Sequence, residues 1–273
     1  MLFLVLLAWP AGSIAGPGEN VLSSAWVKGP HTRARLVAMP WDGKAKLRLG
    51  VQLDLDPGWK TYWRNPGDAG IPPRFDWKGS TNIKEPHLLW PAPERMADDF
   101  GVSIGYKHGT LLPVNIEPAQ GGKPVKLALE VNYGVCADVC IPVTSRLDLE
   151  LRPAAAMRGP HDALIARWSR RVPGPAASSG LDIASVKPLS RDGKAGFEVV
   201  ISGKGGLQDP ALFVEGPRDY YFSVPERVFL DKDRAVYRFE VDDLDSVDQL
   251  RDKKLLFTLK DKARAAERTW ILK

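Results

Sequence analysis

The segment VKLALEVNYGVCADVCIPVTSRLDLEL, residues 125–151, consists of two runs of alternating apolar and polar side chains around a short centre. Alternation with a period of two is the pattern of a strand that buries one face. Because the two runs follow one another so closely, the segment predicts an antiparallel hairpin that folds about Asp138, with 137–139 as its turn.

This fold makes the register of the hairpin predictable. Each apolar residue of one run then faces an apolar residue of the other, and the two cysteines of the chain also become neighbours; the predicted pairs are Leu129 with Leu147, Tyr133 with Val143, and Cys136 with Cys140. Directly opposed residues of antiparallel strands have Cα atoms about 4.5–5.5 Å apart, which is within disulfide range. The cysteines share the parity of the polar face, unless a bulge changes it. Pro142 cannot donate to a ladder, so it indicates a strand end or an edge strand.

Three chemistries are open to Cys136 and Cys140. A structural disulfide is the usual state of two cysteines in an exported protein, but a loop of about five residues gives a stabilisation of only roughly 2 kcal/mol. A redox couple fits a tight pair at an exposed hairpin tip, because thiol–disulfide exchange needs an approachable sulfur. A metal site is disfavoured, since the four His and four Met residues form no ligand-spaced cluster with the thiols. The residues alone leave the first two equally open.

Composition sets the outer bounds. The chain has 273 residues, of which 44% are hydrophobic, so it can build the cores of two ordinary domains. Its formal charge is +5, and the Lys and Arg residues are scattered among Asp and Glu rather than clustered. Nucleic-acid readers concentrate positive charge on one surface. No nucleic-acid partner is therefore expected.

The first residues, MLFLVLLAWPAGSIAGPGEN, predict an export signal. An apolar run over 2–9 precedes small residues that suit cleavage after Ala15, giving a signal peptide over 1–15. No Lys or Arg precedes the apolar run, which is atypical. The run is too short to span a bilayer, and no later segment is apolar enough to do so. We expect a mature protein that is soluble and lies in an oxidising compartment.

The rest of the chain predicts an all-β protein with two immunoglobulin-like β-sandwich domains joined by a short helix. Short alternating runs with frequent Gly and Pro dominate, as in 46–55, 196–202 and 254–260. In 160–172 the apolar residues recur instead at helical spacing, and PGPAASSG (173–180) follows as a linker. The expected domains are a redox domain over 17–156, a helical connector and linker over 157–179, and a second β domain over 180–273.

Three stretches of the first domain resemble the N-terminal periplasmic domain of the DsbD and ScsB family of disulfide reductases. They are GWKTYWRNPGDAGIPPRFDW (58–77), WPAPERMADDFGVSIGYKHGTLLPV (90–114) and YGVCADVCIP (133–142). The last has the C-x3-C spacing of the ScsB type. The second domain has no motif that matches as well.

The resemblance implies an immunoglobulin-like domain that relays electrons through Cys136 and Cys140 without a cofactor. The expected partners are a membrane-embedded electron donor and thioredoxin-like periplasmic proteins, and the expected location is the periplasm. Because family members continue into a transmembrane region and this chain ends at Lys273, the donor is expected to be encoded separately. The second domain, which has no Cys or His, is expected to position or recruit partners.

Four further residues take site roles from the resemblance. Phe100 matches the aromatic residue of a cap loop that shields the cysteines, and Asp98 and Asp99 would flank it. Tyr133 matches an aromatic position just before the first cysteine. The simpler alternatives are that Phe100 is a core aromatic and Tyr133 an ordinary strand residue.

Two other interpretations remain. The chain could be a non-enzymatic periplasmic binding protein or metal-tolerance adaptor with a structural disulfide. Its reduction potential would discriminate, since structural disulfides lie below about −300 mV. Four tryptophans could form a sugar-binding platform, although core and turn packing is the stronger expectation for Trp59, Trp63, Trp77 and Trp90. His87 and His108 are expected at the surface.

Overall fold

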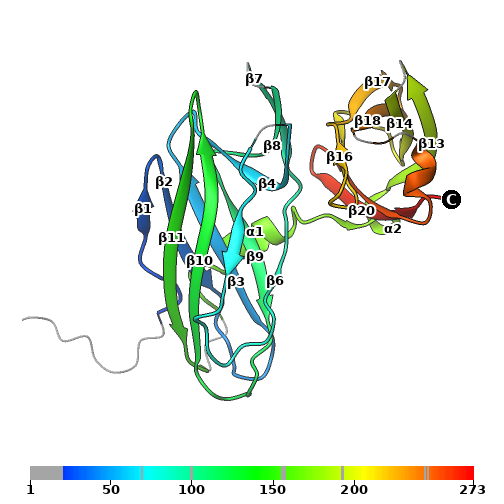
Figure 1. Cartoon of the computed structure of the whole chain (residues 1–273). Helices are drawn as coiled ribbons and strands as arrows, with labels where there is room; N and C mark the ends of the chain where they lie inside the picture. The colour runs from blue at the N-terminus through cyan, green and yellow to red at the C-terminus, as the bar shows by residue number, and fades with distance from the viewer. Residues whose placement is uncertain are drawn as a thin grey trace, which may run out of the picture.

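The computed structural model confirms an all-β protein with two immunoglobulin-like parts. It describes residues 21–68, 70–98, 101–154, 158–191, 194–242, 244 and 246–273. The predicted signal peptide, 1–15, lies outside these residues. No helix in the described ranges is long and apolar enough to cross a bilayer. In Figure 1 the strands up to β11 form the larger body and those from β13 onward form the second body beside it.

Two antiparallel sheets make up the first half. One has the strand order β1-β2-β3-β9-β6, and the other has the order β11-β10-β4-β8-β7 with β5 paired to β10. The strands are β1 Val27–Gly29, β2 Thr32–Ala38, β3 Leu47–Leu55, β4 Lys60–Gly67, β5 Arg74–Asp76, β6 His87–Leu88, β7 Glu94–Asp98, β8 Gly101–Lys107, β9 Gly109–Ile116, β10 Val125–Cys136 and β11 Cys140–Leu151. The sequential neighbours β10 and β11 lie at one edge, and β4 is brought beside β10 from far along the chain.

The second half repeats the two-sheet plan. Its sheets have the orders β12-β20-β19-β15 and β13-β14-β18-β16, with β17 also paired to β18. The strands are β12 Gly174–Pro175, β13 Leu181–Arg191, β14 Lys194–Gly203, β15 Pro210–Glu215, β16 Tyr221–Phe222, β17 Glu226–Leu230, β18 Arg234–Asp242, β19 Lys254–Asp261 and β20 Arg264–Ile271. The short helices are α2 Ala176–Ser179 and the 3-10 helix η1 Val247–Leu250.

The predicted hairpin is confirmed residue by residue. Strands β10 and β11 pair without a bulge from Val125 opposite Leu151 to Cys136 opposite Cys140, and Tyr133 faces Val143 as expected. Pro142 lies in β11, which is an edge strand of its sheet, so the missing backbone N–H costs no ladder bond on the outer side. The apolar stripe of both strands enters the core between the two sheets of this half, together with Leu36, Leu49 and Val51.

The predicted helix appears as α1, Asp162–Ser169, and it packs on the first half. Ile165 is 1% exposed and lies with Val37 and Leu111, while Leu164 and Trp168 cover the same small core. Part of the segment expected as a linker belongs to the second half, because Gly174 in β12 pairs with Ala266 of β20. The boundaries 17–156, 157–179 and 180–273 stay predictions.

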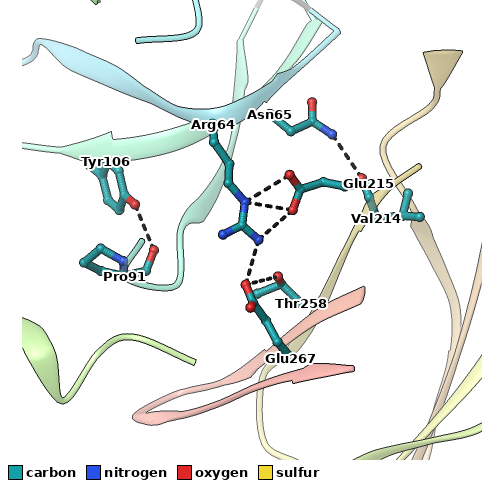
Figure 2. A network of polar contacts seen from close by, with 8 residues as sticks. All are labelled: Arg64, Asn65, Pro91, Tyr106, Val214, Glu215, Thr258 and Glu267. Carbon is teal, nitrogen blue, oxygen red and sulfur yellow. Dashed lines mark hydrogen bonds and ion pairs between the residues drawn. The ribbon is translucent and has the colours of Figure 1, made fainter. Parts of the chain in front are cut away.

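A polar network joins the two halves (Figure 2). The guanidinium of Arg64, in β4, donates to both carboxylate oxygens of Glu215 at 2.6–3.0 Å and to Glu267 at 2.6 Å. Thr258 donates to the same oxygen of Glu267, at 3.2 Å, and Asn65 donates to the carbonyl of Val214 at 3.0 Å. A forked guanidinium held by two carboxylates is a strong and directional contact. It ties β4 of the first half to β15 and β20 of the second.

An apolar contact accompanies this network. Phe213 of the second half is 1% exposed and belongs to a cluster formed otherwise by buried residues of the first half, Trp63, Ile104, Tyr106 and Leu112. The rings of Phe213 and Trp63 have centroids 5.8 Å apart. The two halves therefore share a small core on one side of β4.

Candidate functional site

A disulfide closes the tip of the β10–β11 hairpin. It joins Cys136, the last residue of β10, to Cys140, the first residue of β11, and their Cα atoms are 4.1 Å apart. The two ends differ in environment, because Cys136 is 2% exposed whereas Cys140 is exposed, as are Asp138 and Val139 of the turn. An incoming sulfur can therefore reach one half of the bond much more readily than the other.

Cys136 is buried although the alternation of the sequence places it on the polar face of the strand. On its face of β10, Lys126 is exposed and Ala128, Glu130 and Asn132 are half-buried. At the disulfide end this face is covered by Tyr62 and Ile71. A Cβ atom at Gly134 would lie 2.8 Å from Cβ of Ile71 and 3.1 Å from the ring of Tyr62. Only glycine allows so close an approach, so Gly134 lets these two side chains lie on the strand next to the disulfide.

The phenol of Tyr62 reaches the exposed cysteine. Its oxygen lies 3.2 Å from Sγ of Cys140, and in the disulfide form the sulfur has no hydrogen, so the tyrosine donates. Burial raises the pKa of Tyr62, and the negative charge of Asp98 raises it further. The phenol therefore stays protonated and remains a donor to Cys140 well above neutral pH.

Lys60 of β4 and Asp98 of β7 form an ion pair beside the disulfide end of β10. Lys60 faces Cys136 across the β10–β4 pairing, and its ammonium donates to the carboxylate of Asp98 and, at 2.9 Å, to the hydroxyl of Ser103. The lysine side chain is only 12% exposed. The ammonium thus ties β7, which ends at Asp98, to the strand that carries Tyr62.

The structure brings some of the predicted site residues together and separates one of them. Cys136 and Cys140 form the disulfide, and Asp98 is joined to them through Lys60. Tyr133 points to the opposite face of β10, is 1% exposed, and shares hydrogen-bond distance with Thr32 at 3.2 Å. It lies in the core, as the strand-residue alternative expects. Asp99 and Phe100 lie outside the described residues.

Sequence reasoning missed Tyr62 and Lys60. Both lie in the 58–77 stretch that carries the family resemblance, and their alternation with Thr61 and Trp63 indicates a strand. That alternation could have shown that Lys60 and Tyr62 share a face. It could not have shown that this face meets the cysteines, because the β10 residues that pair with Lys60 and Thr61 are Cys136 and Val135, which lie far along the chain.

The four tryptophans singled out in the sequence pack in or against the cores of the first half. Trp63 is fully buried, and Trp59, Trp77 and Trp90 are partly buried against the two cores of the first half. Trp59 also stacks on His31, with ring centroids 3.9 Å apart. Within the described ranges, no three His, Cys, Asp or Glu side chains gather as a metal site would require.

Comparison with known proteins agrees with this arrangement. Residues 31–151 match the family model described as "Thiol:disulfide interchange protein DsbD, N-terminal", and this range holds both cysteines, Tyr62 and Lys60. The first half is a DsbD N-terminal domain. Residues 171–273 match a domain family of unknown function, DUF8393. No curated protein matches the chain.

One solved structure shows the same fold over both halves. It is the N-terminal periplasmic domain of ScsB from Proteus mirabilis, with a TM-score of 0.75 and 22% sequence identity. The match covers 92% of this chain and 98% of that one. The two halves of this chain therefore have the same order and overall fold as that structure.

Proposed function

We propose that this protein is a periplasmic thiol–disulfide exchange protein that relays electrons through Cys136 and Cys140. Electrons would come from a membrane reductase and pass to thioredoxin-like periplasmic proteins. The observation that carries the proposal is the disulfide at the hairpin tip, in a DsbD N-terminal domain, with one buried and one exposed sulfur. The membrane donor and the thioredoxin-like acceptors are inferred from the family.

The difference in exposure between the two cysteines supports a separate role for each. In the reduced protein, the thiolate of Cys140 attacks the disulfide of the partner, forms a mixed disulfide, and releases the partner's other sulfur as a thiolate that takes up a proton. The thiolate of Cys136 then attacks Sγ of Cys140, which re-forms the internal disulfide and frees the partner as a dithiol. Two electrons pass to the partner, and the membrane reductase restores both thiols.

Tyr62 supports the first step. Its phenol lies at hydrogen-bond distance from Sγ of Cys140 and stays protonated because its pKa is raised. A donor at this place stabilises the thiolate of Cys140 relative to the thiol, and the thiolate is the attacking species. Cys136, which is covered by protein, acts after the mixed disulfide has formed.

Trapping of the mixed disulfide tests the proposal. Cys136→Ser leaves the exposed sulfur without the one that resolves the intermediate, so it should accumulate disulfide-linked partners in periplasmic extracts, identified by mass spectrometry. Cys140→Ser is the matched control and should trap few or none, because Cys136 is buried. Equal trapping by both variants would contradict the assigned roles, and trapping by neither would contradict the relay.

The adaptor with a structural disulfide is the competing function. Equilibration of the purified protein with glutathione redox buffers measures the reduction potential of the pair. The relay predicts a potential above about −300 mV, whereas a structural disulfide would lie below it.

A further inference from the structure

A cleft of about 700 Å³ lies where the two halves and helix α1 meet. Its wall combines residues of the first half such as Glu94 and Tyr106, the end of α1 near Trp168, and the β19–β20 hairpin of the second half. In Figure 1, α1 lies at the junction between the two bodies. The volume is within the range of sites that hold a small molecule.

The charged residues that line the cleft are mostly cations. One acid, Glu94, lies among the lining residues, against seven basic ones. Of these seven, Arg264 is paired with Asp261. Within the described part of the chain, the other six make no ion pair: Lys107, Arg167, Arg170, Arg171, Lys260 and Lys262. Several exposed cations elsewhere have acidic partners, among them Arg33, Lys46, Lys78 and Lys194.

Helix electrostatics explain only part of this charge. Basic side chains at 167, 170 and 171 suit the negative end of the helix dipole of α1. Lys107, Lys260 and Lys262 come from β8 and from the β19–β20 hairpin, so the dipole does not account for them. Basic side chains from three separate elements therefore line the same cleft.

Two of the cations are held in place. The backbone carbonyl of Arg171 accepts from the N–H of Ala92 at 2.8 Å, and its guanidinium lies 4.6 Å from the ring centroid of Trp168. The ammonium of Lys260 donates to the carbonyl of Pro93 at 3.1 Å across the junction of the two halves. Burial lowers the pKa of Lys260, and the charge of Arg171 lowers it further, although Glu94 and Asp209 oppose this. Burial therefore disfavours the charged form of Lys260, and an anion bound beside it would stabilise that form.

We propose that this basic cleft, defined by the six unpaired cations, binds a small organic polyanion that carries phosphate or carboxylate groups. Arg supplies forked donors that match either group, and Lys adds point charge. A ligand with two or more anionic groups can contact both halves and α1 at once. The volume of about 700 Å³ suits a small molecule.

Calorimetric titration with pyrophosphate and with citrate, at constant ionic strength, tests the proposal. One saturable site per chain is expected. Arg171→Ala and Lys262→Gln should each weaken binding by about tenfold. Lys262 is exposed in the β19–β20 turn, so its variant leaves the fold intact. Arg48→Ala and Lys126→Met remove one exposed charge each from strands that do not line the cleft, and should change the dissociation constant less than about twofold.

Two further arms separate the alternatives. The double variant Cys136→Ser/Cys140→Ser should bind both anions unchanged, so the result is independent of the redox proposal. A hexaglutamate peptide tests for an acidic protein segment. Binding of the peptide alone, no saturable binding of either small anion, or equal loss in cleft and control variants would each overturn the proposal.

Discussion

At the scale of single residues, the environment of Cys140 depends on its hydrogen bond with the phenol of Tyr62, which packing holds in place. Tyr62 is 2% exposed, and its ring is confined by the backbone at Gly134 on one side and at Gly70 on the other, where a Cβ atom would lie 2.6 Å away. This confinement leaves the phenol oxygen 3.2 Å from Sγ of Cys140. The reactivity of that sulfur should therefore depend on a side chain held by packing rather than by other polar contacts.

Tyr62→Phe removes the donor and keeps the ring. A hydrogen bond to a charged acceptor contributes about 1.5–3 kcal/mol, so the thiol pKa of Cys140 in the reduced protein should rise by roughly 1–2 units. The rate of alkylation by iodoacetamide as a function of pH measures this shift.

Tyr133→Phe is the matched control for this substitution. It also removes a buried phenol, which lies 3.2 Å from the hydroxyl of Thr32, but on the face of β10 away from the cysteines. It should lower stability by about 1 kcal/mol and leave the alkylation profile unchanged. If the profile moved as much as in Tyr62→Phe, the hydrogen bond to Cys140 would not be its cause, and the family-derived role of Tyr133 would gain support.

At the scale of elements, the β10–β11 hairpin has backbone pairing and core contacts in addition to its disulfide. The two strands pair without interruption over twelve residues each, and their apolar stripes are buried along the whole length. The bond closes only the turn at one end.

Reduction of the disulfide should leave the protein folded. The loop between the cysteines has a sequence separation of 4, for which the loss of chain entropy corresponds to about 2 kcal/mol. Urea unfolding with and without dithiothreitol measures the change, and far-ultraviolet circular dichroism checks the fold. Collapse of the fold on reduction would identify the disulfide as a structural staple.

The β7–β8 pair lies on the side of β4 that is away from β10. Asp98 at the end of β7 contacts Lys60, which faces Cys136, and Asp98 also pairs with Gly101 of β8. Phe100 lies between these two described residues in the sequence. The shielding of the disulfide by the segment around Phe100, which the family resemblance implies, stays a prediction.

Phe100→Ala should therefore speed reduction of the disulfide by dithiothreitol several-fold, with little loss of stability. Phe100→Leu keeps an apolar side chain and serves as the matched control. A loss of about 3 kcal/mol or more would place Phe100 in a core instead.

The pairing within the hairpin could be predicted from the sequence, but the contacts of the neighbouring strand could not. Alternation around Asp138 predicted every pair of the hairpin, because strands adjacent in sequence and joined by a short turn leave one register that buries both apolar stripes. The family resemblance contributed Asp98. The contacts of Tyr62 and Lys60 could not be predicted, since alternation shows which residues share a face but not which distant strand lies alongside.

At the scale of the whole molecule, β4 connects the surroundings of the disulfide to the second half. Tyr62 lies against Cys140, and the next residue, Trp63, packs against Phe213 of the second half. One step further, Arg64 binds Glu215 and Glu267 (Figure 2). A fragment over 17–156 would expose Trp63, Ile104 and Tyr106 at once. A slower reaction of that fragment could then come from the lost recruiting surface or from the lost packing. A single substitution at the interface separates these two causes better.

Phe213→Ala empties the shared core from the side of the second half. Truncation of a buried phenylalanine costs about 3–5 kcal/mol, so urea unfolding should show a large loss of stability. Phe229→Ala, at a side chain that is 50% exposed, is the matched control and should change stability by less than about 1 kcal/mol. Because Trp63 loses its partner, amide hydrogen exchange should quicken over 60–64 of β4 as well as over 210–215 of β15. Faster exchange confined to 210–215 would show that the halves are energetically independent, and the second half would then have no route through β4 to the disulfide.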